Sequence, residues 1–177
     1  MEKKVRLVTW NVWNNLEMDP KTRATLIAHT FRRADIVLAQ ERTDELLGYL
    51  RPLLDDYFKY RTKAAGNPYY TMLFSRWPLK YENRQSYRTS TQNRDLLSAF
   101  VELDNGLMVF VGTSHLESLG SGSLEREYQL QEGLRLMYHP QVISQKPILR
   151  VFGGDMNLKA VFDGEVQVPI EFWIDPW

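Results

Sequence analysis

The segment Asp35-Ile36-Val37-Leu38-Ala39-Gln40-Glu41 contains four consecutive apolar residues followed by two polar ones. An uninterrupted apolar run of this length suits a strand that is buried on both faces, as in a sheet covered by helices. Amphipathic stretches with helical spacing lie on either side of it, at residues 22–34 and 43–54, and a β-branched run at residues 5–11 precedes them. This alternation of strands and helices predicts an α/β fold.

After residue 57 the sequence changes to short aromatic and β-branched runs separated by turn residues. This pattern predicts antiparallel strands at residues 57–62, 69–75 and 96–103. Asp104-Asn105-Gly106 predicts a tight hairpin that leads to a further strand at residues 107–113, because Asn and Gly tolerate the positive φ angles of such a turn.

The remaining predicted elements are one helix and one or two strands. Ser123 is predicted to cap a helix that runs to about Met137, with acidic residues in its first turn. Residues 147–152 are predicted to form a second strongly apolar strand. Apolar and polar residues alternate over residues 170–175, which is compatible with one more strand.

Length and composition restrict the class of protein. The chain has 177 residues, with 22 basic and 22 acidic side chains and no cysteine. A chain of this length buries roughly 70% of its unfolded surface, so we expect a single domain over residues 1–177. The absence of cysteine excludes thiolate chemistry, and the balanced charge argues against non-specific coating of nucleic acid. No apolar stretch is long enough to cross a membrane and no targeting signal is visible. We therefore expect an intracellular monomer, cytoplasmic or nuclear, without membrane partners.

Polar side chains follow four of the apolar strands. Asn11 follows the first strand and Glu41 the second. His115 follows the strand after the hairpin, and Asp155 and Asn157 follow the last strongly apolar one. In α/β sheets, ligands bind beyond strand ends, where loops bring side chains from several strands together. We therefore expect these residues to converge on one pocket.

Together these residue types suit metal-assisted hydrolysis of a phosphodiester. Glu41 suits Mg²⁺, which takes one or two carboxylates and keeps water and phosphate oxygens as its other ligands. Asp155 can orient an attacking water, and His115 can donate a hydrogen bond to an oxygen that gains charge in the transition state. Taken singly, each residue has a plainer interpretation as a turn former, a solvated strand end or a hydrogen-bonded histidine. Their occurrence together favours the catalytic interpretation.

Four motifs show a family resemblance: Thr9-Trp10-Asn11, Leu38-Ala39-Gln40-Glu41, Thr113-Ser114-His115-Leu116-Glu117-Ser118 and Gly153-Gly154-Asp155-Met156-Asn157-Leu158. In this order and at these intervals they resemble the endonuclease/exonuclease/phosphatase superfamily of metal-dependent phosphoesterases. Within it, the last two motifs are most similar to enzymes that hydrolyse 5′-phosphotyrosyl bonds at DNA ends. The resemblance implies a two-sheet α/β sandwich with a metal-centred site at one end of the sheets.

The resemblance also implies roles for the motif residues. Glu41 would bind Mg²⁺, or Mn²⁺ in its place, and Asn11 would bind beside it, near the scissile phosphate. Asp155 would position or activate water, Asn157 would help to hold the nucleophile, and His115 would contact the phosphate. The implied activity is Mg²⁺-dependent hydrolysis of a 5′-phosphotyrosyl or related phosphodiester. The implied partner is a DNA end that carries a 5′ adduct.

Three further residues are expected to contact the substrate. Arg94 lies in residues 90–95, which resemble the family segment that runs along the substrate strand, although Asn93 stands where glycine is expected. Ser118 lies beside the family histidine and would touch the substrate, and Trp13 would reach it from the loop after the first strand.

One family motif is absent from this sequence. The family pattern continues to a terminal Ser-Asp-His that binds the scissile phosphate, and none of His29, His115 and His139 is preceded by Asp. Loss of one preorganised contact typically costs ~10²–10³ in rate, so we expect reduced activity. We also expect a sandwich that lacks its C-terminal strands and has an open sheet edge, as in a fragment or truncated product of a longer enzyme. The alternative is a naturally short homologue that no longer catalyses.

Two other functions stay open. One is a phosphoesterase of the same superfamily with another substrate, such as abasic-site DNA, a sugar phosphate or a phospholipid head group. The other is a non-catalytic module that binds metal and nucleic acid. In that module, aromatic residues would stack on bases if they are exposed, although aromatic residues of strand regions more often belong to the core. The residues concerned are Trp10, Trp13, Tyr69 and Tyr70.

Overall fold

The computed structural model describes residues 4–12, 19–66, 69–118, 122–139, 142, 147 and 149–157, together with the backbone of residues 160–162, 165–167 and 172–175. The helices are α1 (Pro20–Phe31), α2 (Asp44–Leu54) and α3 (Ser123–Met137). The strands are β1 (Leu7–Asn11), β2 (Ile36–Arg42), β3 (Tyr60–Arg61), β4 (Tyr70–Ser75), β5 (Leu79–Ser86), β6 (Asp95–Glu102), β7 (Met108–His115), β8 (Leu149–Asp155), β9 (Ala160–Phe162), β10 (Glu165–Gln167) and β11 (Phe172–Asp175).

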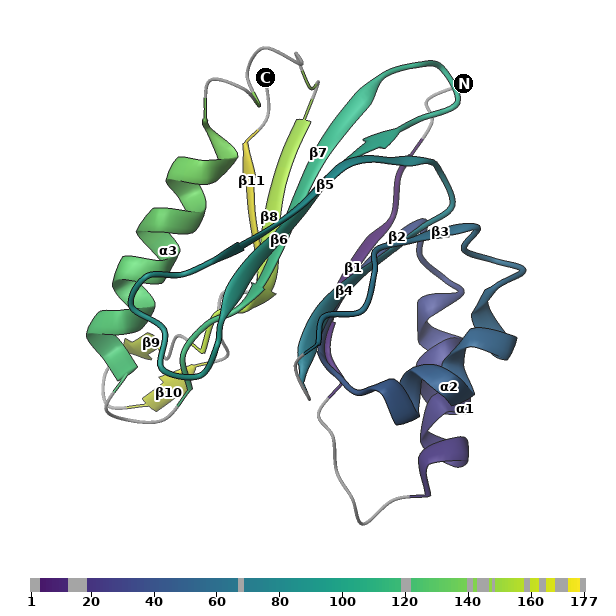
Figure 1. Ribbon diagram of the computed structural model, residues 1–177, viewed down its shortest axis with the longest axis horizontal. Coiled ribbons are helices and arrows are strands. Elements are labelled where there is room, and N and C mark those ends of the chain that lie inside the picture. The colour runs from purple at the N-terminus through teal and green to yellow at the C-terminus, as the bar shows by residue number, and fades with distance from the viewer. Residues whose placement is uncertain are drawn as a thin grey trace.

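These strands form two large sheets that pack face to face, and a separate two-stranded pair (Figure 1). The first sheet has the strand order β1-β2-β4-β3 and the second has the order β11-β8-β7-β6-β5, while β9 pairs with β10. Figure 1 shows α1 and α2 on the outer side of the first sheet and α3 on the outer side of the second. The predicted two-sheet α/β sandwich is therefore confirmed.

The apolar run of β2 is buried on both faces, as predicted. Side chains alternate between the two faces of a strand, so Ile36 and Leu38 belong to the apolar layer between the sheets. Val37 and Ala39 belong to the other layer, which packs against α1 and α2. None of these four residues is more than 1% exposed. Since buried apolar surface contributes about 25 cal/mol per Å², this strand stabilises two layers of the sandwich at once.

The second sheet is buried on both faces in the same way. On β6, Leu97 and Ala99 join the core between the sheets. Leu96 and Phe100 lie on the opposite face, in a core cluster that α3 covers. The rings of Phe100 and Phe110 pack there at a tilt of 40°, with 4.6 Å between their centroids. The fold is thus four layers deep, with helices outside and the two sheets inside.

The predicted hairpin joins β6 to β7, but its turn differs from the expected one. Only Gly106 has a positive φ, at 76°. The Gly106 N–H donates to the Leu103 carbonyl at 2.8 Å, and the Leu103 N–H donates to the Leu107 carbonyl at 2.9 Å. The side chain of Asn105 accepts a hydrogen bond from the Leu107 N–H at 3.1 Å instead of occupying a left-handed position. The turn therefore needs glycine at one position and a side-chain acceptor at the other.

Two local predictions are wrong, and the sequence analysis does not predict one of the strands. Ser123 does not cap α3: it is the first helical residue, and Gly122 at the cap position supplies no side-chain hydrogen bond. The strand expected at residues 57–62 is reduced to β3, because the N–H groups of Tyr57 and Phe58 donate to the Leu54 carbonyl and extend the end of α2. The pattern does not predict β5, because this edge strand is polar and mostly exposed.

β8, which we expect to form an open edge of the second sheet, has a further strand beside it, and that strand, β11, is the edge. β11 pairs antiparallel with β8, from Phe172 opposite Gly153 to Asp175 opposite Arg150. The alternation over residues 170–175 therefore corresponds to a strand. In the first sheet, β1 is an edge strand.

One charged side chain lies inside the core at the end of β2. Arg42 has no exposed surface, and its guanidinium nitrogens have no hydrogen-bond partner among the residues that the structure describes. The guanidinium carbon lies 5.2 Å from the centre of the Phe74 ring. Burial lowers the pKa of Arg42 to about 10. A buried charge without an acceptor destabilises a fold, because no hydrogen bond offsets the loss of its hydration.

Arg42→Met is expected to raise the free energy of unfolding by about 1–3 kcal/mol, because Met fills a similar volume without a charge. Arg42→Lys keeps a buried cationic group and is the matched control, for which no gain is expected. Urea unfolding at neutral pH measures both variants. A lower unfolding midpoint for Arg42→Met than for the wild type would contradict this account of Arg42.

Candidate active site

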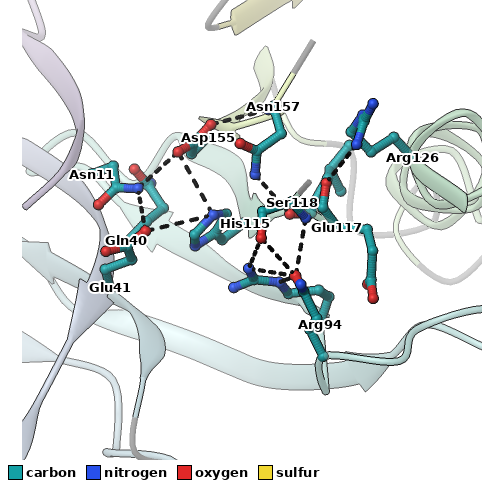
Figure 2. Close-up of polar contacts among 12 residues, drawn as sticks. Asn11, Gln40, Glu41, Arg94, His115, Glu117, Ser118, Arg126, Asp155 and Asn157 are labelled. Carbon is teal, nitrogen blue, oxygen red and sulfur yellow. Dashed lines mark hydrogen bonds and ion pairs between the residues drawn. The ribbon is translucent and has the colours of Figure 1, made fainter. Parts of the chain in front are cut away.

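The two parallel strand pairs bring the predicted site residues to one end of the sandwich. β1 runs parallel to β2 with Asn11 opposite Gln40, and β7 runs parallel to β8 with His115 opposite Asp155. Because parallel strands end at the same edge of a sheet, each pair delivers its terminal side chains together. A hydrogen bond of 2.7 Å from Asn11 Nδ2 to Asp155 Oδ2 then joins the two sheets (Figure 2).

A β-bulge directs Glu41 towards this site. The pairing of β2 with β4 changes register between Ala39 and Arg42, and Glu41, which lies between them, has a φ of 55°. In a regular strand Glu41 would share a face with Val37 and Ala39 and point towards the helices. A bulge redirects a side chain, and positive φ in residues other than glycine is concentrated at functional sites.

Asn11 holds the two acidic side chains together. Its Nδ2 donates to Glu41 Oε1 at 2.8 Å and to Asp155 Oδ2 at 2.7 Å. Carboxylates brought this close repel each other, and the shared donor offsets part of that repulsion. In this geometry Asn11 presents its nitrogen to the cluster, and its role as a metal ligand stays a prediction.

His115 lies against both carboxylates. Its Nε2 is 3.6 Å from Asp155 Oδ2 and 3.8 Å from Glu41 Oε1, and the residue is 6% exposed. Burial and then the positive charge of Arg94 lower the pKa of His115, while the nearby carboxylates act in the opposite direction. The neutral imidazole is therefore favoured at neutral pH, with one N–H available as a donor.

The donor atoms of this cluster suit a hard divalent cation. One ligand atom from each of Glu41, His115 and Asp155 lies within 4.8 Å of the others. Mg²⁺ binds oxygen ligands and commonly takes one or two carboxylates, which leaves positions for water and phosphate oxygens. The residues present therefore fit the metal that the sequence predicts.

The turn after β8 fixes the direction of Asp155. The backbone N–H of Asn157 donates to Asp155 Oδ1 at 3.0 Å, and Asn157 itself has a φ of 48°. The side-chain amide of Asn157 donates to the Leu116 carbonyl at 2.9 Å. Asn157 therefore orients Asp155 and ties β8 to the segment after β7. Its contact with a nucleophile stays a prediction.

Gln40 links the two sheets directly beneath the site. It has no exposed surface, and its Nε2 donates to Thr9 Oγ1 at 3.2 Å in the first sheet and to Thr113 Oγ1 at 3.0 Å in the second. This bridge is buried, so its hydrogen bonds are costly to break. Gln40 is part of a motif in the sequence, but no local pattern shows that it would join the sheets.

A pocket opens beside the carboxylates, and residues from both sheets line it: Glu41, Tyr69, Tyr70, Thr71, Asn93, Arg94, Asp95 and His115. Of the three expected substrate contacts, Arg94 lines this pocket, and Ser118 lies next to it, with 3.4 Å between Arg94 Nη2 and Ser118 Oγ. Trp13 lies outside the described residues.

The aromatic residues near the site differ in exposure. Tyr69 is 53% exposed and lines the pocket. Tyr70 is buried and donates its hydroxyl to Asp44 Oδ1 at 2.8 Å, and burial raises its pKa. Trp10 packs edge-on against Phe31, with 6.1 Å between ring centroids. Tyr69 and Tyr70 both line the pocket, and Tyr70 also belongs to the core, whereas Trp10 is 38% exposed beside α1.

Two residues that form hydrogen bonds with Arg94 or with its loop, Glu117 and Gln92, are missing from the sequence-based prediction. Glu117 is 2% exposed, although an acidic residue outside a strand is ordinarily solvated. Its partners include Gln129 of α3, and contacts between distant segments leave no local pattern. Gln92 lies in a polar loop, where nothing in the sequence distinguishes it from its neighbours.

The fold and this site define a class of protein. The model of the Endonuclease/Exonuclease/phosphatase family matches residues 8–164 of the chain. The match covers most of the chain, from β1 to the hairpin that follows β8, and the chain belongs to this family.

Within the family, the chain is similar to tyrosyl-DNA phosphodiesterase 2 (TDP2). It is 27% identical over 172 residues to that protein from Danio rerio. The structure of truncated Caenorhabditis elegans TDP2 has a TM-score of 0.74 at 26% identity, over 94% of this chain and 66% of that one. The structure of D. rerio TDP2 complexed with single strand DNA product has a TM-score of 0.73 at 25% identity, over 90% of this chain and 63% of that one.

The chain spans only part of these relatives. The match includes 93% of this chain but 43% of the D. rerio protein. The region held in common is the two-sheet body described above. Among the described residues, no helix combines the length and the apolar character that crossing a membrane requires.

Proposed function

We propose that this chain is a Mg²⁺-dependent phosphodiesterase that hydrolyses 5′-phosphotyrosyl or closely related bonds at DNA ends, with Mn²⁺ as an alternative ion. The observation behind the proposal is the convergence of Glu41 from one sheet with His115 and Asp155 from the other, within 4.8 Å. Similarity to tyrosyl-DNA phosphodiesterase 2, one structure of which contains a single-stranded DNA product, supports the choice of substrate.

Each side chain of the cluster has a distinct task in this reaction. Glu41 holds the cation, which when bound polarises the phosphoryl group and neutralises its charge. Asp155 orients the attacking water and accepts its proton, as the water oxygen bonds to phosphorus and the bond to the tyrosyl oxygen breaks. His115 donates a hydrogen bond to a non-bridging phosphate oxygen. The products are a 5′-phosphate and a tyrosine; the phenolate takes a proton from solvent, and Asp155 releases to solvent the proton that it accepted.

Three substrates test the proposal: a single-stranded oligonucleotide with a 5′-tyrosyl group, a duplex with an abasic site, and a sugar phosphate. Mg²⁺-dependent release of tyrosine, at least tenfold faster than cleavage of the other two, is the expected result. Cleavage of the abasic duplex alone would overturn the substrate assignment. Salt-dependent binding of the oligonucleotide without cleavage of any substrate would overturn the enzymatic proposal in favour of a binding module.

Mg²⁺ is expected to stabilise the protein, and Glu41→Gln is expected to remove most of that effect, because the amide cannot neutralise the cation. At about ten times its dissociation constant, Mg²⁺ adds roughly 1.4 kcal/mol to the free energy of unfolding. For a chain of this size that is about 3–6 °C in melting temperature. Glu45→Gln, which changes an exposed acid on α2, is the matched control. Equal melting temperatures of the wild type in Mg²⁺ and in EDTA would count against a metal site.

A further inference from the structure

The side-chain oxygen of Gln92 accepts hydrogen bonds from two separate segments of the chain. Arg94 donates to it from Nη2 at 2.8 Å and from Nε at 3.2 Å. Ser118 donates to it from the backbone N–H at 3.0 Å and from Oγ at 2.9 Å. One amide oxygen therefore ties the Arg94 side chain, which precedes β6, to the segment that follows β7.

This contact fixes one edge of the Arg94 guanidinium and leaves the other available. Nε and Nη2 face Gln92, whereas Nη1 has no hydrogen-bond partner among the described residues. Arg94 lines the pocket together with Glu41 and His115, and Figure 2 shows it beside Ser118 and below His115. A guanidinium held along one edge presents the rest of its planar array of donors to an anionic oxygen in the pocket.

The loop that carries Gln92 is itself anchored on a buried carboxylate. Glu117 accepts hydrogen bonds from Ser90 Oγ at 3.0 Å, from the Thr91 N–H at 3.0 Å and from Gln129 Nε2 at 3.1 Å, and also from the Thr91 hydroxyl. Burial acts to raise the pKa of Glu117, but hydrogen bonds from Thr91, Gln129 and Ser90 outweigh it and lower that pKa. The carboxylate therefore stays charged at neutral pH and binds its donors strongly.

Ser90 connects Glu117 to the residues that follow in the loop. Its Oγ accepts hydrogen bonds from the Arg94 N–H at 2.7 Å and from the Gln92 N–H at 3.3 Å. The backbone on both sides of Asn93 is thereby held, and Asn93 has a φ of 57°. The loop conformation and the Arg94 side chain are thus fixed by separate contacts, through Glu117 and Gln92 respectively.

We propose that Gln92 is a positioning residue that orients the guanidinium of Arg94 to bind a phosphodiester oxygen of the substrate. This inference rests on the proposed function. An unrestrained arginine side chain loses conformational entropy when it binds an anion, and this loss weakens binding. Because Gln92 already holds Arg94 in the folded protein, less entropy is lost when the substrate binds. Gln92→Met, which keeps the length of the side chain but has no acceptor, is therefore expected to raise KM about three- to tenfold with little change in kcat.

A double-mutant cycle with Arg94→Met separates positioning from a general structural effect. If Gln92 acts through Arg94, Gln92→Met is expected to have no further effect on KM once Arg94 is replaced. Equal effects in both backgrounds would overturn the proposal, as would a wild-type KM for Gln92→Met. Gln85→Met, at an exposed position on β5, is the matched control and is expected to leave KM and melting temperature unchanged.

Two further measurements distinguish failure of this inference from failure of the proposed function. If Asp155→Asn abolishes hydrolysis while Gln92→Met behaves as the wild type, only the role of Gln92 is wrong. If the wild type does not hydrolyse the 5′-tyrosyl oligonucleotide, the proposed function is wrong. The same cycle is then measured as the affinity for a 5′-phosphorylated oligonucleotide by fluorescence anisotropy. A three- to tenfold weaker affinity for Gln92→Met, absent in the Arg94→Met background, would support the positioning role, and equal affinities would overturn it.

Discussion

Asp155→Asn is expected to lower the rate of hydrolysis about 10³-fold. The amide has the size of the carboxylate and keeps an oxygen that can accept the hydrogen bond from Asn11 or from the Asn157 N–H. It carries no charge, however, and cannot accept a proton from the attacking water. The rate is measured in single turnover with enzyme in excess over the 5′-tyrosyl oligonucleotide, so that weaker binding does not obscure the chemical step.

The same substitution gives a second result that does not depend on turnover. In EDTA, Asp155→Asn is expected to unfold at the wild-type temperature or above it, because one of two adjacent carboxylates loses its charge. Asp56→Asn, at a side chain that is 97% exposed, is the control and is expected to change neither rate nor stability. A large loss of stability in EDTA together with the loss of rate would assign Asp155 a structural role instead.

Gly154→Ala is expected to lower the free energy of unfolding by about 3 kcal/mol or more, because among the glycines whose surroundings are described it is the one where an added Cβ meets the closest atom. Gly154 has a φ of 150°, and a Cβ at this position would lie 2.0 Å from the carbonyl oxygen of Ser114. Because that oxygen belongs to the backbone of β7, no side-chain rotation relieves the clash. β7 and β8 would have to separate where Ser114 lies opposite Gly154, one position before His115 and Asp155.

Gly48→Ala is the matched control for this substitution. Gly48 lies within α2, and nothing comes within 4 Å of a Cβ built there. Alanine is the better helix former, so this change is expected to raise the free energy of unfolding by about 0.5–1 kcal/mol. Urea unfolding of the two variants measures the contrast. A Gly154→Ala protein as stable as the wild type would contradict the close approach of β7 and β8.

The fold follows from the sequence wherever burial leaves a local pattern. The apolar run of β2 and the hairpin between β6 and β7 are recognisable because each is decided by residues within a few positions. β5 is not, because an edge strand satisfies its hydrogen bonds on one side only and needs no apolar alternation. The capping of α3 is misplaced by one residue because Ser123 is as suitable inside the first turn as before it.

The site is predictable only in part, for a related reason. Glu41, His115 and Asp155 each end an apolar strand, so their convergence follows from the way that α/β sheets deliver strand ends. Gln92 and Glu117 act through contacts with Ser118 and Gln129, which are distant in sequence and have no periodic relation to them. The bulge that redirects Glu41 is likewise invisible, because it depends on the pairing of β2 with β4.

Glu41 and Asp155 belong to different sheets, and the side chains between those sheets act as a spacer. Ile36 and Leu38 on one side and Val111 and Val151 on the other belong to this layer, and their volumes set the spacing of the two sheets. Under the proposed function, removal of a methyl group from this interior is expected to shift Glu41 relative to Asp155 and to lower the rate while the protein is still folded. Selection for turnover would then preserve the volume of these side chains more strictly than folding requires. The rate of hydrolysis would respond to small changes in the spacing of the sheets.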